Sequence, residues 1–142
     1  MGRLLAIDYG RKRTGIAVSD SLQIIANGLT TVDTYQLFDF LKEYLSKEKV
    51  AAIIVGLPRQ MNNEPSENMQ RIEEFVRKFK QLHPQVPMEY FDERFSSKLA
   101  HRAMIDGGLK KKDRQNKALV DEISATIILQ GYMESRRMNP SI

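Results

Sequence analysis

One short segment constrains the fold of this chain more than any other. It is the apolar run VAAIIV at residues 50–55, which contains no polar side chain and ends at Gly56. An amphipathic helical pattern lies on each side of it, over residues 35–48 and 66–82. A strand that is apolar on both faces is typical of the interior of a parallel sheet covered by helices. We therefore predict an α/β protein with this strand in the middle of the sheet.

The rest of the chain extends this pattern. Two apolar runs separated by a glycine-containing turn predict a β-hairpin, and further segments alternate between strand and helix character. We predict strands over residues 3–9, 15–20, 24–33 and 86–91, and further helices over 96–106 and 116–136. The order βββαβαβαα predicts a mixed five-stranded sheet flanked by helices on both faces, which is the ribonuclease-H-like order. Because no linker or repeat divides it, we expect residues 1–142 to form a single domain.

Composition narrows the class of protein. The chain has no cysteine, so disulfides, thiolate metal sites and cysteine nucleophiles are all excluded. No apolar run is long enough for a membrane span or a signal peptide, and we expect a cytoplasmic protein with no membrane contact. The 22 Lys and Arg against 18 Asp and Glu give a net charge of +4. This excess is compatible with a polyanionic partner.

The positive charges occur in clusters. One cluster lies in the predicted hairpin turn between Gly10 and Gly15, and a second precedes the last helix. Glycines let a backbone approach a phosphate closely, although the same turn could be only a solvated hairpin tip. We predict nucleic-acid contacts from these clusters, the alternative being mobile solvated segments. Their members are Arg11, Lys12 and Arg13, and Lys110, Lys111, Lys112, Arg114 and Lys117.

Three acidic residues fall at positions that should face the protein interior. Asp8 and Glu93 each follow an apolar strand, and Asp121 shares a helical face with Ala125 and Ile128. Three like charges repel one another unless a cation lies among them, and carboxylate oxygens suit Mg²⁺ or Mn²⁺. Metal ions held in this way can activate a water and stabilise the leaving oxygen of a phosphodiester. We therefore predict that these three acids form a catalytic metal site.

Each acid also has a structural interpretation, and the sequence leaves it open. Asp8 could cap the hairpin turn, Glu93 could pair with Arg94, and Asp121 could pair with Lys117 four residues earlier. The argument for a metal site depends on the three acids converging at one edge of the sheet.

Four segments together resemble the YqgF/RuvX family. They are IDYGRKRTGIAVSD at residues 7–20, IVGLP at 54–58, DERFSS at 92–97 and KALVDEISATIILQGY at 117–132. The four motifs occur in the family's order and are spread through essentially the whole chain, so the resemblance is specific.

The resemblance implies a ribonuclease-H-like fold related to Holliday junction resolvases, and a role in maturing the 5′ end of pre-16S rRNA in the bacterial cytoplasm. It places the family's acidic positions on Asp8, Glu93 and Asp121, and it implies that Arg94 orients Glu93 or contacts phosphate. Two residues depart from the family pattern. Ser124 replaces a small apolar residue, and Glu122 is an extra acid about 100° around the helix from Asp121. Glu122 leaves open which acid of the pair faces the metal.

Three functions are compatible with these features. The first is a metal-dependent endonuclease acting on structured RNA, with four-way DNA junctions as the alternative substrate. The second is a nucleotide-binding module, since the hairpin also resembles the phosphate loop of the actin and sugar-kinase superfamily, but those proteins use two such domains. The third is a non-catalytic RNA-binding factor acting on pre-ribosomal particles. The sequence does not distinguish a monomer from a homodimer, whereas a junction resolvase would need a symmetric dimer.

Overall fold

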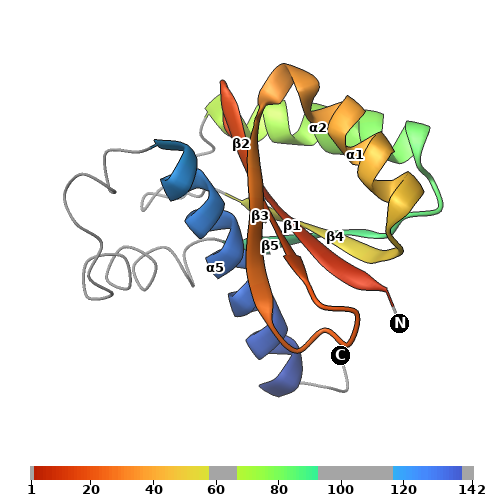
Figure 1. Cartoon of the computed structure of the whole chain (residues 1–142). Coiled ribbons are helices and arrows are strands. Elements are labelled where there is room, and N and C mark those ends of the chain that lie inside the picture. Colours follow the sequence, from red (N-terminus) through yellow and green to blue (C-terminus); the bar gives the residue numbers. More distant parts are fainter. Residues whose placement is uncertain (1, 58–66, 93–116, 139–142) are drawn as a thin grey trace.

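The computed structural model describes residues 2–57, 67–92 and 117–138, and these contain a single five-stranded sheet. The strand order is β3-β2-β1-β4-β5, with β1 in the middle (Figure 1). β1 pairs antiparallel with β2 and parallel with β4, so the sheet is mixed, as predicted. The strands are β1 (Arg3–Asp8), β2 (Arg13–Ser19), β3 (Ala26–Asp33), β4 (Val50–Leu57) and β5 (Met88–Asp92).

The apolar run at residues 50–55 lies in β4, which has a parallel neighbour on each side. A strand in this position is covered on both faces, which explains why its sequence shows no polar alternation. The prediction of an internal parallel strand is therefore confirmed, but its predicted place in the middle of the sheet is wrong, because β1 occupies the middle and β4 lies beside the edge strand β5.

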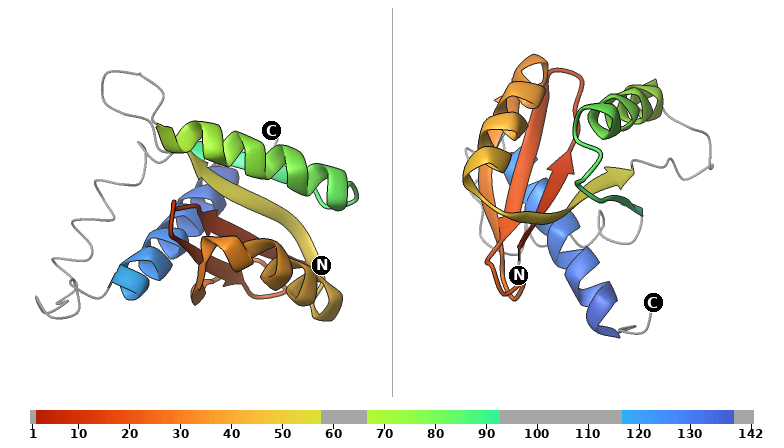
Figure 2. Two further views of the ribbon diagram at one scale, coloured as in Figure 1. Left: turned by 90° about the horizontal axis from the view of Figure 1, so that it is seen from above. Right: turned by 90° about the vertical axis from the view of Figure 1, so that its right-hand side faces the viewer.

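Helices cover both faces of the sheet. α1 (Leu37–Lys47) and α2 (Glu67–Leu82) lie on one face, and α5 (Lys117–Met138) crosses the other (Figures 1 and 2). A short 3₁₀ turn, η1 (Thr34–Gln36), leads from β3 into α1. The expected helix over 96–106 lies outside the described residues. None of the helices in the described ranges is long and apolar enough to span a bilayer.

The central strand β1 separates two cores. Its residues Leu5 and Ile7 pack beneath α1 and α2, whereas Leu4 and Ala6 pack beneath α5. Successive side chains of a strand point to opposite faces, so Asp8, the next residue in the even series, belongs to the α5 face. The core beneath α5 contains four alanines, three on the sheet and one on the helix, which allow the helix to approach the sheet closely. Its members are Leu4, Ala6, Ala17, Ala52, Ile54, Ala125, Ile128, Leu129 and Met133.

The third strand is shorter than predicted, because β3 begins at Ala26 instead of residue 24. The carboxylate of Asp20 accepts hydrogen bonds from the backbone N–H groups of Ile24 and Ile25, at 2.7 and 2.9 Å. These bonds hold the segment as a loop, and both isoleucine side chains are more than half exposed. The same bonds lower the pKa of Asp20. Ile24 and Ile25 look like the start of a strand in the sequence. Their backbone N–H groups, however, donate to the Asp20 side chain instead of to a neighbouring strand.

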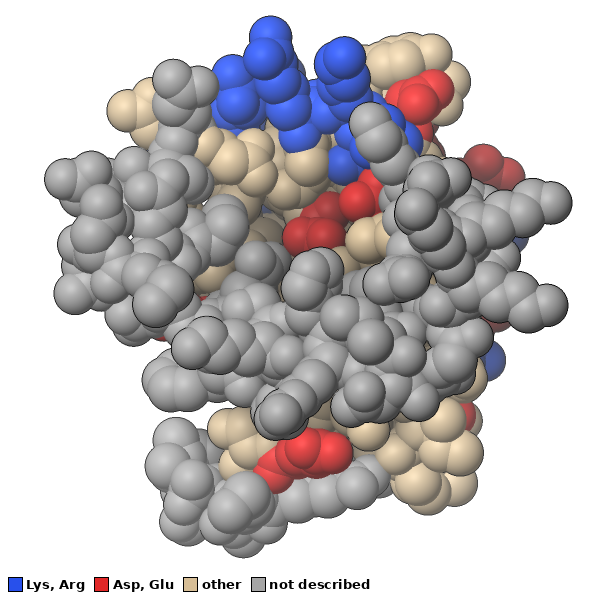
Figure 3. Space-filling model, turned by 90° about the vertical axis from the view of Figure 1, so that its left-hand side faces the viewer, with Lys and Arg blue, Asp and Glu red and all other residues tan. Residues whose placement is uncertain are grey.

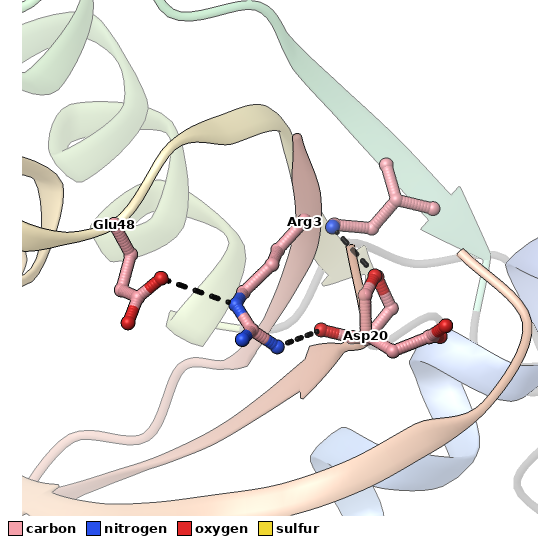
Figure 4. Close-up of polar contacts among 5 residues, drawn as sticks. Arg3, Asp20 and Glu48 are labelled. Carbon is pink, nitrogen blue, oxygen red and sulfur yellow. Dashed lines mark hydrogen bonds and ion pairs between the residues drawn. The ribbon is translucent and has the colours of Figure 1, made fainter. Parts of the chain in front are cut away.

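A polar network fixes the amino-terminal end of β1 (Figure 4). The Arg3 guanidinium donates to the backbone oxygen of Ser19 at 3.0 Å and pairs with the Glu48 carboxylate at 3.3 Å. The Ser19 hydroxyl accepts from the backbone N–H of Leu4 at 2.9 Å. Because these contacts lie at the opposite end of β1 from Asp8, they anchor the central strand without involving its carboxyl end.

Candidate active site

Asp8 is the last residue of the central strand. The parallel strands β1, β4 and β5 end at the same edge of the sheet, where Leu57 is the register partner of Asp92. In open α/β sheets ligands bind outside the carboxyl ends of the strands. Asp8 is half-buried there, and its register partner on β2 is Gly15.

Asp121 reaches the same place from the other end of the chain. It lies in the second turn of α5, and a Cβ atom built on Gly15 would overlap the backbone carbonyl of Asp121. The helix backbone therefore fills the space that a side chain at this position would need. Gly15 is adjacent to Asp8 across the strand pair and to Asp121 across the helix contact. Two of the three predicted acids are thus brought together around one glycine.

Arg13 forms an ion pair with Asp121. Its Nε atom donates to Oδ2 of Asp121 at 3.0 Å, and the two side chains are 37% and 26% exposed. Arg13 is the first residue of β2, two positions from Gly15, so its side chain lies on the α5 face of the sheet. Partial burial reduces the screening of this pair by water. The carboxylate of Asp121 therefore lies next to a fixed positive charge.

Glu122, the extra acid, lies elsewhere. A Cβ atom on Gly28 would meet the side chain of Glu122, so this acid lies over β3. Asp121 is the acid of the pair that faces Arg13 and the carboxyl end of β1. This placement favours Asp121 over Glu122 as the proposed metal ligand, which stays a prediction.

The cationic turn between β1 and β2 is held in place by Thr34. The Thr34 hydroxyl donates to the Gly10 carbonyl at 2.7 Å, and its backbone N–H donates to the Lys12 carbonyl at 2.9 Å. The buried hydroxyl of Thr14 lies 2.9 Å from the hydroxyl of Thr34. Since the Thr34 hydrogen is used on Gly10, Thr14 donates to Thr34. The turn is a fixed structure that presents the exposed side chains of Arg11 and Lys12.

On the surface beside this site, positive and negative side chains form separate, neighbouring groups (Figure 3). Figure 3 shows Lys and Arg side chains gathered along the upper edge of this face, with Asp and Glu side chains directly below them. A phosphate bound at the cationic edge of this face would therefore lie next to carboxylates (Figure 3).

The structure describes only part of the predicted site. Glu93, Arg94, Lys110, Lys111, Lys112 and Arg114 lie outside the described residues, and Lys117 begins α5 without a described side chain. Within residues 2–57, 67–92 and 117–138, no group of three or more His, Asp or Glu residues is placed to hold a metal ion. The three-acid site therefore remains a prediction.

Two contacts of the site were not predicted from the sequence: the ion pair between Arg13 and Asp121, and the hydrogen bonds from Thr34 to the turn. The ion pair that the structure shows for Asp121 is with Arg13, whereas Lys117 was the alternative considered. The hydrogen bonds from Thr34 to the turn were also not anticipated. No local pattern signals either contact, because each joins elements whose relative position depends on the whole fold.

The fold and the site together define a class of protein. It is an α/β protein with a mixed five-stranded sheet, an acidic residue at the carboxyl end of the central strand, and a cationic turn beside it. The model of the RuvX family, described as Holliday junction resolvase, matches residues 2–135. The chain belongs to this family, so the family predicted from the four motifs is confirmed.

Relatives align along nearly the whole chain. A protein of Bacteroides thetaiotaomicron is 69% identical over 137 residues, which cover 96% of this chain and 99% of the relative. One from Bacteroides fragilis is 68% identical over 138 residues, covering 97% and 100%, and one from Flavobacterium johnsoniae is 57% identical over 137 residues, covering 96% and 99%. All three carry the name "Putative pre-16S rRNA nuclease". Among solved structures, "Thermus thermophilus RuvC structure" has a TM-score of 0.49 and 13% identity, covering 94% of this chain and 96% of that one.

Proposed function

We propose that this protein is a metal-dependent endonuclease that processes the 5′ end of pre-16S rRNA in the bacterial cytoplasm. The observation that carries the proposal is the placement of Asp8 and Asp121 around Gly15, beside a cationic turn. Carboxylates next to a phosphate-binding surface are the arrangement expected for metal-assisted phosphodiester hydrolysis. We propose pre-16S rRNA as the substrate because the relatives carry the name "Putative pre-16S rRNA nuclease".

The proposed metal ligands are Asp8, Glu93 and Asp121. The donor set fits Mg²⁺ or Mn²⁺, because both ions prefer carboxylate oxygens. Two of the ligands come from elements that meet at Gly15. A bound ion would activate a water and stabilise the leaving oxygen of the phosphodiester. Arg13 would restrict the orientation of the Asp121 carboxylate through its Nε–Oδ2 bond.

The proposed RNA contacts begin at the cationic turn. Arg11 and Lys12 are exposed and lie on a backbone that Thr34 holds in place, so both cations can bind phosphates without ordering the turn first. The remaining proposed contacts are those predicted from the sequence, namely Arg94, Lys110, Lys111, Lys112, Arg114 and Lys117. Arg13 differs from them because Asp121 already occupies its Nε atom.

The decisive test compares the wild type with Asp8→Asn on a labelled precursor 16S 5′ fragment. Asp39→Asn is a matched control, because Asp39 is exposed on α1 and lies on the opposite face of the sheet. We expect the wild type and the control to cut with Mg²⁺ or Mn²⁺ and to stop in EDTA, and Asp8→Asn to bind the RNA without cutting it. Equal cleavage by Asp8→Asn would refute the assignment of Asp8. If all variants bind and none cuts, a non-catalytic assembly factor becomes the better account.

A four-way DNA junction is the second candidate substrate, because the family model is described by that activity. Cutting two strands of a junction symmetrically requires a two-fold dimer. The same assay with a mobile junction, together with the mass of the protein in solution, separates the two substrates. A monomer that cuts RNA and leaves the junction intact supports the rRNA function.

A further inference from the structure

An exposed aromatic side chain lies beside the cationic turn. Tyr35 is 80% exposed, more than any other large hydrophobic side chain in the part of the chain that the structure describes. Exposing an aromatic ring to this extent contributes nothing to the core. In contrast, Tyr9 and Phe38 pack against the ring of Phe75 beneath the helices, at centroid distances of 5.2 Å.

The backbone holds Tyr35 close to Arg11 and Lys12. Tyr35 lies in η1 and directly follows Thr34, which is hydrogen-bonded to the carbonyls of Gly10 and Lys12. Two bonds of 2.7 and 2.9 Å therefore connect the residue before the aromatic ring to both sides of Arg11. This connection places the backbone that carries the exposed ring beside the backbone that carries the two exposed cations, and we call these three residues the Tyr35 surface (Arg11, Lys12 and Tyr35).

An exposed aromatic ring next to fixed cations is the combination that binds unpaired nucleotides. The ring stacks on a base, and the cations hold the neighbouring phosphates. A continuous duplex cannot use such a ring, because its bases are already stacked on one another. The surface therefore selects for a strand with an unpaired segment.

We propose that Tyr35 stacks on an unpaired base of the RNA substrate while Arg11 and Lys12 bind the adjacent phosphates; this inference rests on the proposed RNA-processing function. It adds a requirement to that function, since the RNA must carry a single-stranded segment that reaches this surface.

Fluorescence tests the stacking directly. The chain contains no tryptophan, so Tyr35→Trp introduces a single indole at the proposed contact. The probes are an RNA hairpin with an unpaired 5′ extension of adenylates and a blunt hairpin with the same number of phosphates, both in EDTA to prevent cutting. We expect the extended hairpin to quench the indole emission and the blunt one to leave it nearly unchanged. Equal responses to the two RNAs would contradict stacking.

Affinity measurements supply the second test. We expect Tyr35→Ala to weaken binding of the extended hairpin by about 5- to 150-fold, the range that one stacked base accounts for, and to leave the blunt hairpin unaffected. Tyr35→Phe keeps the ring and should bind like the wild type. The matched control is Tyr90→Ala, because Tyr90 is a 43% exposed tyrosine on β5, at the opposite edge of the sheet from β3.

The outcomes separate this inference from the function on which it rests. If the wild type cuts the precursor and Tyr35→Ala binds the extended hairpin equally well, the stacking proposal fails and the nuclease proposal stands. If Tyr90→Ala weakens binding as much as Tyr35→Ala, the effect is not specific to this surface and the proposal also fails. If the wild type cuts the precursor but binds neither hairpin, the stacking proposal fails and the nuclease proposal stands; if it neither cuts the precursor nor binds a hairpin, both fail.

Discussion

Gly15 is the residue on which the site depends most directly. Its missing side chain lets α5 lie on β2, and this contact brings Asp121 to the carboxyl end of the central strand. The sequence suggested a different role for this glycine, a close approach to phosphate. The structure fills the space at Gly15 with the protein's own helix backbone.

Gly15→Ala should therefore destabilise the protein and displace α5. The new methyl group would meet the backbone carbonyl of Asp121, which cannot rotate away, so we expect a loss of about 2–3 kcal/mol, at the upper end of overpacking costs. Gly28→Ala is the control, because the group it meets is the flexible side chain of Glu122. Urea denaturation of both variants measures the difference. Equal losses would show that α5 adjusts freely at Gly15.

Residue roles were partly predictable from the sequence. Asp8 and Asp121 could be selected because a carboxylate in an apolar pattern is costly and local periodicity gives its direction. The partner of Asp121 could not be predicted. Arg13 and Asp121 are 108 positions apart, and only the packing of α5 on β2 brings them together.

At the scale of elements, α5 is also attached to the edge strand β5. The Tyr132 hydroxyl donates to the Glu89 carboxylate, and the guanidinium of Arg136 lies 5.6 Å from the centre of the Tyr132 ring. Burial of the phenol, together with the bond to Glu89, raises the pKa of Tyr132 to about 12. This contact and the contact at Gly15 fix α5 across the sheet at two points.

The contact between Tyr132 and Glu89 predicts a loss of stability in alkali. The folded pKa of Tyr132 lies above its ordinary value of 10.0, so its stabilising contribution is complete below pH 10 and is lost as the pH rises towards about 12. The difference in unfolding free energy between the wild type and Tyr132→Phe should therefore be constant at pH 8 and 9 and shrink at pH 10.5 and 11. Urea denaturation at these four values tests it. If the difference in unfolding free energy between the two proteins stays the same at all four pH values, ionisation of Tyr132 does not affect stability and the prediction is wrong.

Most elements were predictable because their apolar periodicity is local. The sequence indicated strand β4 and helices α1 and α2 within about two residues of their observed bounds. The start of β3 was wrong because Asp20 takes the backbone donors of Ile24 and Ile25, a bond that hydrophobic periodicity does not register. The mixed sheet was predictable from the hairpin and from the alternation of strands and helices. The close approach of α5 to the sheet was not, because it depends on Gly15, whose contact with the helix backbone is visible only in three dimensions.

At the scale of the whole molecule, exposed cations lie at both ends of the sheet, and two of them lie together in the turn beside the proposed site. The net charge is +4, and Arg11 and Lys12 are exposed in the turn that follows the carboxyl end of β1. The opposite end carries the Arg3–Glu48 pair, in which a negative charge accompanies the positive one. Attraction of a polyanion should therefore depend on the turn more than on the total charge.

Lys12→Gln should reduce the salt dependence of RNA binding. Removing one phosphate contact lowers the slope of log K against log salt concentration by about 1. Lys49→Gln is the matched control, because Lys49 is exposed just before β4, at the amino ends of the parallel strands. Binding isotherms between low and moderate salt give both slopes. If Lys49→Gln lowers the slope by the same amount, RNA binding depends on the net charge of the protein and not on a contact with the turn.

The packing of α5 also has a consequence for biosynthesis. Asp8 lies in the first strand and Asp121 in the last helix of the part of the chain that the structure describes, so Asp8 is synthesised well before Asp121. Until α5 emerges, the nascent chain exposes the sheet face formed by Leu4, Ala6 and Ala17, and the proposed metal ligands are incomplete. The proposed site is therefore assembled only when α5 packs on the sheet. Under that proposal, RNA cleavage would begin only once the fold is complete.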